Sequence, residues 1–85
     1  MNPRKLLARL AAGSLQNVSF TDVQRLAQHL GFALQRVSGS HHIYAHSSVP
    51  ELLNVQDVAG RAKPYQIKQL LRLVERYNLR LEDEP

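Results

Sequence analysis

Hydrophobic and polar residues alternate with two different periods along the chain. Three stretches repeat their apolar residues at the spacing of a helix that buries one face. They cover residues 3–12, residues 19–30 and a last stretch that opens at Pro64. The last stretch is the most regular, with apolar positions at Ile67, Leu70, Leu71, Val74 and Tyr77. The pattern predicts three amphipathic helices.

The first two helices carry recognisable start and stop residues. Asn2-Pro3 opens the first stretch and Gly13 follows it, an arrangement typical of a capped helix. Ser19 precedes the second stretch as a capping residue, with Asp22 three positions later, and Gly31 ends it. We therefore expect both helices to be short and sharply bounded.

Between the second and third helices the period shortens to that of β-strands. The three runs typical of strands are residues 32–37, 41–46 and 51–56. Phe32 and Leu34 are expected on one face of the first strand, and Ser38-Gly39-Ser40 predicts a hairpin turn after it. Residues 57–63 then predict a flexible basic loop before the last helix.

The order of these elements predicts an α+β fold in two layers. A three-stranded antiparallel sheet would pack one face on the helices and leave the other face open. We expect one domain over residues 1–85, since a chain of 85 residues cannot close two cores. Within it, residues 1–18 form an N-terminal extension with a helix, residues 19–80 the core, and residues 81–85 an acidic tail.

Composition and charge narrow the class of protein. There is no cysteine, which excludes disulfide scaffolds and cysteine-based zinc sites. No apolar run is long enough to span a bilayer, and the N-terminus lacks the apolar core of a signal peptide, so a cytoplasmic protein is expected. All eleven Lys and Arg lie in residues 1–81 against four acidic residues, a net charge of +7 that favours a polyanionic partner.

Three of the four histidines lie close together in the second predicted strand, at His41, His42 and His46. Strand alternation places His41 and Ile43 on one face, and His42, Tyr44 and His46 on the other. We expect the Tyr44 ring to face the helices, which leaves His41 on the open face beside the turn. Ile43 argues for the opposite orientation, because it would then be exposed.

The histidine cluster is not expected to bind a metal ion. His42 and His46 share a face but are about 13 Å apart along a strand, and His41 points away from both. Zinc–nitrogen bonds of about 2.0–2.1 Å require ligands that converge on one point. No metal site is therefore predicted within the chain.

A site for RNA cleavage is one interpretation of the region around His41. An imidazole can take the proton from a 2′-OH while cationic side chains hold the phosphate. Arg61 and Lys63 in the predicted loop are the candidate phosphate contacts, and Arg36 and Ser40 beside the turn are further candidate RNA contacts. The residues do not single out a second acid or base.

The motif Gly39-Ser40-His41 with an aromatic residue at Tyr44, together with the order of the elements, resembles the HicA family of bacterial toxins. The resemblance covers roughly residues 20–80. It implies a fold like that of a double-stranded-RNA-binding domain and a ribonuclease activity on mRNA that needs no metal or cofactor. The family's catalytic histidine carries over to His41.

The resemblance also implies a HicB-type antitoxin as partner, which covers the histidine-bearing surface and alone contacts operator DNA. Many members have a Pro-His pair after the third strand, whereas residues 54–58 contain no histidine. Two other functions remain open from the residues themselves. They are a non-catalytic RNA-binding module and a protein-binding accessory domain, for which the leucine stripe of residues 3–12 is the only direct indication.

Overall fold

The structure is a computed structural model, and it describes residues 1–82. The elements follow one another as α1 (Pro3–Ala11), α2 (Phe20–His29), β1 (Ala33–Ser38), β2 (His41–His46), β3 (Val49–Gln56) and α3 (Pro64–Arg76). The predicted fold class is confirmed: an α-β-β-β-α order with a three-stranded antiparallel sheet and an additional N-terminal helix. Residues 83–85 of the predicted acidic tail lie outside the described residues.

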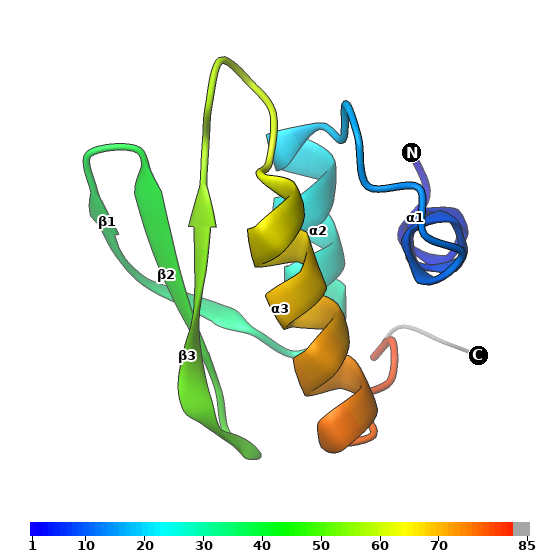
Figure 1. The fold of residues 1–85 in the computed structure, drawn as a ribbon. Coiled ribbons are helices and arrows are strands. Elements are labelled where there is room, and N and C mark those ends of the chain that lie inside the picture. Colours follow the sequence, from blue (N-terminus) through cyan, green and yellow to red (C-terminus); the bar gives the residue numbers. More distant parts are fainter. Residues whose placement is uncertain (83–85) are drawn as a thin grey trace.

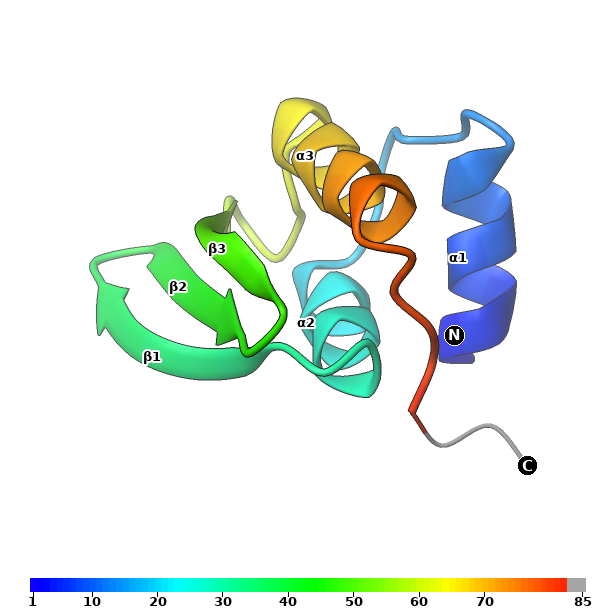
Figure 2. The ribbon, with the colours of Figure 1, turned by 90° about the horizontal axis from the view of Figure 1, so that it is seen from below.

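The N-terminal helix adds a third layer to the two layers formed by the sheet and the helix pair. The sheet covers one side of α2 and α3, and α1 covers the other side (Figures 1 and 2). Two leucines of α1, Leu6 and Leu10, are both fully buried. The N-terminal helix is therefore part of the core, because its apolar stripe closes the side of the helix pair that the sheet leaves open.

The predicted start of α2 is confirmed. The Ser19 hydroxyl accepts a hydrogen bond from the backbone N–H of Asp22 at 3.2 Å. Val18 and Val23, which flank the cap, are both buried and join the core. At the first helix, the Asn2 side chain accepts a 2.8 Å hydrogen bond from the backbone of Arg4, as its capping position predicts.

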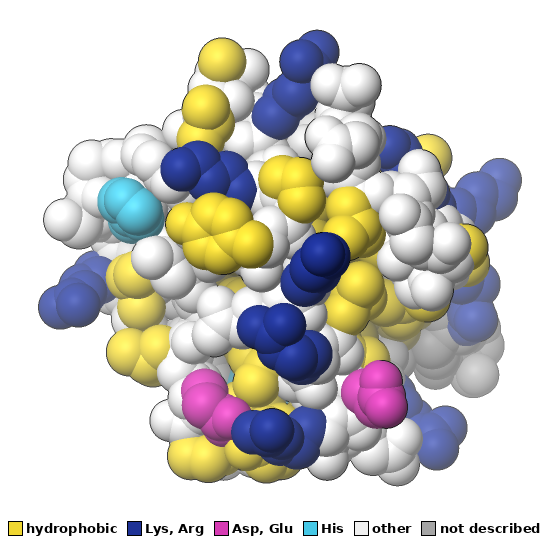
Figure 3. Space-filling model, in the orientation of Figure 1, with side chains coloured by type: hydrophobic (Ala, Val, Ile, Leu, Met, Phe, Trp, Pro, Cys, Tyr) yellow, Lys and Arg dark blue, Asp and Glu magenta, His cyan; other side chains and the backbone are white. Residues whose placement is uncertain are grey.

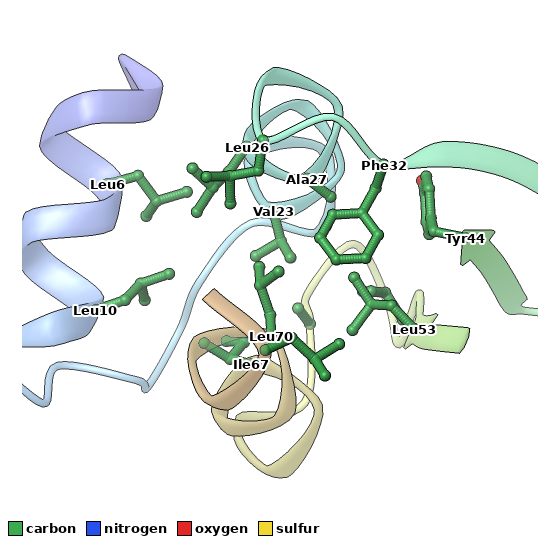
Figure 4. Packing of buried hydrophobic residues seen from close by; sticks show 14 of the residues in the cluster. Leu6, Leu10, Val23, Leu26, Ala27, Phe32, Tyr44, Leu53, Ile67 and Leu70 are labelled. Carbon is green, nitrogen blue, oxygen red and sulfur yellow. The ribbon is translucent and has the colours of Figure 1, made fainter. Parts of the chain in front are cut away.

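The core runs without interruption from α1 to the sheet. Figure 4 shows Leu6 and Leu10 of α1 facing the pair α2 and α3, and Phe32, Tyr44 and Leu53 on the side of the sheet. In α3 the buried apolar residues are Ile67, Leu70 and Leu73. The prediction for Leu71, Val74 and Tyr77 was partly wrong: they are half-buried and pack against the margin of the core.

β1 is an edge strand that lies beyond the helices. The sheet order is β1-β2-β3, and all six residues of β1 are exposed. Leu34 pairs with Tyr44 across the sheet, yet it is 42% exposed, whereas Phe32 is buried. Phe32 precedes the first residue of β1, and β1 itself extends beyond the helices (Figure 2), so the two side chains differ in burial.

Three strand boundaries differ from the prediction. β1 begins and ends one residue later than predicted, and β3 begins at Val49 rather than Glu51. Val49 is buried opposite His46, which extends the strand toward the β2–β3 turn. Pro50 is tolerated in this strand because β3 forms the other edge of the sheet.

The segment from residue 57 to residue 63 is held in place, so its predicted flexibility was wrong. The carbonyl of Gly60 accepts a 2.9 Å hydrogen bond from Phe20, and the N–H of Ala62 donates one of 2.9 Å to Val18. The Asp57 side chain accepts a 2.8 Å hydrogen bond from Gly60 within the turn. These bonds fasten the segment to the start of α2.

The C-terminal end of α3 is tied to β3. The Tyr77 hydroxyl donates a 2.6 Å hydrogen bond to Glu51, and Arg76 forms a 3.0 Å ion pair with the same carboxylate. The hydrogen bond from Tyr77 lowers the pKa of Glu51, and Arg76 adds to this effect. The same bond raises the pKa of Tyr77, and Arg76 opposes part of that rise. None of the helices described in residues 1–82 is long and apolar enough to cross a membrane.

Candidate active site

His41 is the first residue of β2 and follows a two-residue turn. Ser38 and His41 form the last pair between β1 and β2, so Gly39 and Ser40 make the turn. Gly39 has a φ of +60°, a conformation that glycine adopts at the first position of such hairpin turns without strain. The turn therefore places an imidazole at the end of a rigid strand.

The predicted orientation of β2 is confirmed. Tyr44 is fully buried and pairs with the buried Leu53 of β3, so its ring lies on the side of the helices. His41 lies three positions earlier and therefore faces the opposite side, away from the helices. This explains the spacing of the motif, since the aromatic residue holds the strand while the histidine stays partly exposed. Ile43, on the open face, is only half-buried.

A side chain of β3 orients the His41 ring. The Nδ1 atom of His41 lies 3.1 Å from the Oδ1 atom of Asn54. An amide oxygen can only accept, so Nδ1 carries the proton and Nε2 carries the lone pair in the neutral ring. Asn54 therefore selects the tautomer in which Nε2 is the basic nitrogen.

The turn before His41 is fixed by hydrogen bonds to Ser40. Its carbonyl accepts from the backbone of Asp57 at 2.9 Å and lies 3.2 Å from Nδ1 of His42. Its hydroxyl accepts a 3.1 Å bond from the side chain of Gln56. The backbone N–H of Gln56 in turn donates a 2.6 Å bond to the side chain of Gln66, which is 2% exposed. A polar chain thus joins α3, the end of β3 and the turn.

The other two histidines of β2 have structural contacts. The His42 ring packs on Phe20 at 4.6 Å between centroids, and the His46 ring meets Phe32 edge-on at 5.1 Å. Nε2 of His46 lies 3.0 Å from the Leu30 carbonyl. Within residues 1–82, no three His, Asp or Glu side chains lie close enough together to hold a metal ion.

The predicted cationic residues fall into two groups. Arg36 pairs with Ile43, so it shares the open face of the sheet with His41. Arg61 is paired with Ser19 at the start of α2, and Lys63 occupies the N-cap position of α3 without a capping bond from its side chain. The β1–β2 turn and the segment that carries Arg61 and Lys63 lie at the same end of the sheet (Figure 1).

Basic side chains are not confined to the loop. Figure 3 shows Lys and Arg side chains spread along α3, and on the same side of the molecule a histidine is exposed beside the sheet. The exposed basic residues of this helix are Lys68, Arg72 and Arg76. The end of the sheet that carries the β1–β2 turn therefore lies beside a helix whose exposed face is positively charged.

Two residues of the site were missed by sequence reasoning. Asn54 contacts the His41 ring, and Gln66 is the one buried polar residue among residues 1–82. The contact of Asn54 could have been predicted, because Asn54 lies on the same face of the sheet as His41 when β3 pairs with β2 in this register. Gln66 had none, since a glutamine in the first turn of a helix is ordinarily exposed.

The fold and the site define a class of protein: a small, basic α+β protein that presents one tautomer-selected imidazole on the open face of its sheet. A family model described as HicA toxin of bacterial toxin-antitoxin matches residues 20–75, and the chain belongs to this family. It is thus the toxin of a toxin–antitoxin system, with an antitoxin as its partner. No curated protein and no solved structure matches the chain. The match leaves out α1.

Proposed function

We propose that the protein is an mRNA-cleaving endoribonuclease that acts in the cytoplasm and uses His41 as its general base. The single observation that carries the proposal is the contact between Nδ1 of His41 and Asn54. This contact leaves Nε2 as a base on the partly exposed, open side of the sheet. Membership in the toxin family supports a toxic activity, and the resemblance of the motif Gly39-Ser40-His41 implies a catalytic role for His41.

The reaction proposed is transfer of a phosphate ester within the RNA strand. Nε2 of His41 takes the proton of a 2′-OH, and the 2′ oxygen attacks the adjacent phosphorus. The bond from phosphorus to the 5′ oxygen breaks, and that oxygen takes a proton from water. The hydroxide that remains takes the proton held by His41, which restores the neutral ring. The products are a 2′,3′-cyclic phosphate and a 5′-hydroxyl end, and the step requires neither a metal nor a cofactor.

The cationic residues would hold the RNA backbone at this end of the sheet. Arg36 is the best-placed candidate, because it shares the open face with His41. Arg61 and Lys63 would contact phosphates that lie beyond the turn. For Ser40, its three hydrogen bonds support a role in shaping the turn in addition to the RNA contact expected from the sequence.

The antitoxin partner would be of the HicB type and would cover the open face around His41. Covering this face would remove the base from its substrate, which is the simplest form of inhibition. Contact with operator DNA would come from the antitoxin alone. A binding test follows, since RNA and antitoxin should compete for the free toxin.

Induced expression tests the proposal, with the wild-type chain beside His41→Ala and Leu52→Ala. Leu52 is 53% exposed and lies four residues from the end of β3 that faces His41, so its removal serves as a control on the same strand. We expect the wild type and Leu52→Ala to arrest growth and cleave transcripts. We expect His41→Ala to cleave at least about 100-fold more slowly. Purified wild-type protein should produce RNA fragments that end in a cyclic phosphate even when a metal chelator is present.

Three results would contradict the proposal. The first is equal cleavage by wild type and folded His41→Ala, and the second is a product with a free 3′-hydroxyl. The third is RNA binding without cleavage by the wild-type chain, which would favour the RNA-binding module. Circular dichroism of His41→Ala must show that the variant is folded.

A further inference from the structure

Tyr65 is an aromatic side chain that the fold leaves in solvent. It is 61% exposed, whereas Phe20, Phe32 and Tyr44 are each at most 5% exposed. Among residues 1–82 it is the most exposed of the large hydrophobic side chains. An aromatic ring left in water does not gain the free energy of burial, and a role in binding would account for this exposure.

Two lysines place positive charge near the Tyr65 ring. The Lys63 ammonium lies over the ring, 5.8 Å from its centroid. Lys68 follows Tyr65 by three residues, one turn along the same helix, and is exposed. The first turn of α3 contains no acidic residue. Figure 3 shows hydrophobic and basic side chains side by side over the start of α3.

Hydrogen bonds connect Tyr65 with the end of the sheet that carries His41. The Gln66 side chain lies 3.5 Å from the Tyr65 hydroxyl and accepts the 2.6 Å bond from the backbone of Gln56. Gln56 pairs with His41 across the β2–β3 ladder. A series of contacts therefore runs from the Tyr65 ring, through Gln66 and the last residue of the edge strand β3, to the strand position opposite His41.

We propose that Tyr65 stacks on one unpaired base of a single-stranded RNA while Lys63 and Lys68 contact the neighbouring phosphates. The proposal rests on the RNA-directed function proposed above and adds to it a second point of attachment. Every base has a π-face, so an aromatic platform holds the strand without reading its sequence. A cation beside the ring adds attraction for the phosphates that flank the stacked base.

The platform would also restrict the substrate. A base inside a duplex is already stacked on its neighbours, so only an unpaired segment can use the ring. A strand anchored at Tyr65 would cross the edge of β3 before it reaches His41. The toxin should therefore bind single-stranded RNA more tightly than duplex RNA of the same length.

The test measures RNA affinity without cleavage, in the full chain that carries His41→Ala. The probe is a fluorescein-labelled 12-nucleotide single-stranded RNA, followed by fluorescence anisotropy at several salt concentrations. Added to this background are Tyr65→Leu, Tyr65→Phe, Lys63→Met and, as an exposed apolar control on β1, Leu34→Ala. Tyr65→Phe keeps the ring, and Tyr65→Leu removes it while keeping an apolar side chain.

We expect Tyr65→Leu to weaken binding about 5- to 100-fold at every salt concentration. Tyr65→Phe and Leu34→Ala should stay within about twofold of the background. Lys63→Met should reduce the slope of log affinity against log salt by about 0.7, whereas Tyr65→Leu should leave the slope unchanged. An abasic nucleotide at one position of the probe should weaken binding to the background but not to the Tyr65→Leu protein.

The outcomes separate the two proposals. If the background binds no RNA, the RNA-directed function falls and the platform falls with it. If RNA binds and Tyr65→Leu binds equally well, the platform alone is overturned. A loss of antitoxin affinity with unchanged RNA affinity would also overturn it and would assign the ring to the protein interface.

Discussion

The side-chain oxygen of Gln66 lies 2.6 Å from the backbone nitrogen of Gln56 and accepts its hydrogen bond. Gln56 is the last residue of β3, an edge strand, so its N–H has no further strand to pair with. A helix residue thus completes the ladder at the point where β3 faces His41. The contact explains why a polar side chain is buried in the first turn of α3.

Replacing Gln66 by Met keeps its approximate volume and leaves the Gln56 N–H without its partner. We expect the free energy of unfolding to fall by about 1–3 kcal/mol, because a buried donor is left unsatisfied. We also expect kcat to fall with KM unchanged, since the turn before His41 loses its support. Urea denaturation and steady-state cleavage measure the two effects.

Gln69→Met is the control for this substitution, because Gln69 lies in the same helix and is half-exposed. It should change neither stability nor kcat beyond the error of the measurement. A Gln66→Met protein that is destabilised but cleaves with unchanged kcat would show that the contact serves the fold alone.

Asn54→Asp should move the pH dependence of cleavage to higher pH. A carboxylate beside Nδ1 favours the protonated imidazole, and a protonated ring cannot act as a base. The acidic limb of the plot of kcat against pH should therefore shift to higher pH by about one unit or more. Leu52→Asp places the same charge on the same strand face, about 7 Å further away, and should shift the limb less.

Asn54→Leu separates charge from orientation. It removes the hydrogen bond to His41 without adding a charge, so kcat should fall while the acidic limb does not move up. An Asn54→Asp profile that coincides with wild type would contradict the assignment of His41 as the base.

Tyr44→Phe should raise the free energy of unfolding by about 1 kcal/mol near neutral pH. The Tyr44 hydroxyl is buried and, among residues 1–82, makes no hydrogen bond of good geometry, which is a cost to the folded state. Its removal leaves the ring contacts in place. Urea denaturation checks the prediction, and Tyr65→Phe at an exposed ring should change stability little.

The same substitution should alter the alkaline limit of stability. Burial raises the pKa of Tyr44 above its ordinary value of 10.0, and a weak interaction with Gln24 opposes part of the rise. As pH rises above 10, the unfolded chain loses this proton first, so the wild-type protein loses stability. The Tyr44→Phe protein should lose less stability over the same pH range. An equal loss of stability in both proteins would contradict the raised pKa of Tyr44.

Leu6→Ala should destabilise the whole protein rather than α1 alone. Leu6 is 1% exposed, and its truncation opens a cavity between α1 and the helix pair, at a cost of about 2–5 kcal/mol. Below the unfolding transition, cleavage should be unchanged, because α1 lies on the side away from the sheet. Leu7→Ala, at a half-buried position, should lower the free energy of unfolding by a smaller amount. An equal loss of stability in the two variants would show that α1 is not part of the core.

Much of the fold follows from local chemistry in the sequence. The cap at Ser19, the proline that opens α3 and the glycine at position 39 each require one local conformation, and the structure has these elements there. The orientation of Tyr44 also followed, since a large ring favours the helix side of a strand. These features depend on neighbours that are close in the chain.

The rest depends on contacts between distant residues. The exposure of Leu34 results from the edge position of β1, which no spacing of residues reveals. The rigidity of the segment before α3 comes from backbone bonds to Val18 and Phe20, about 40 residues away. Asn54 and Gln66 acquire their roles only when β3 is placed beside β2 and α3.

The exposed strand β1 has a consequence for the free toxin at high concentration. Its outer edge offers unpaired backbone groups, and Leu34 and Val37 add exposed apolar surface of 42% and 52%. Such an edge is a template for association between copies and finally for aggregation. Arg36 is the one charged residue of β1, so the side chain proposed to contact RNA would also oppose self-association of the toxin.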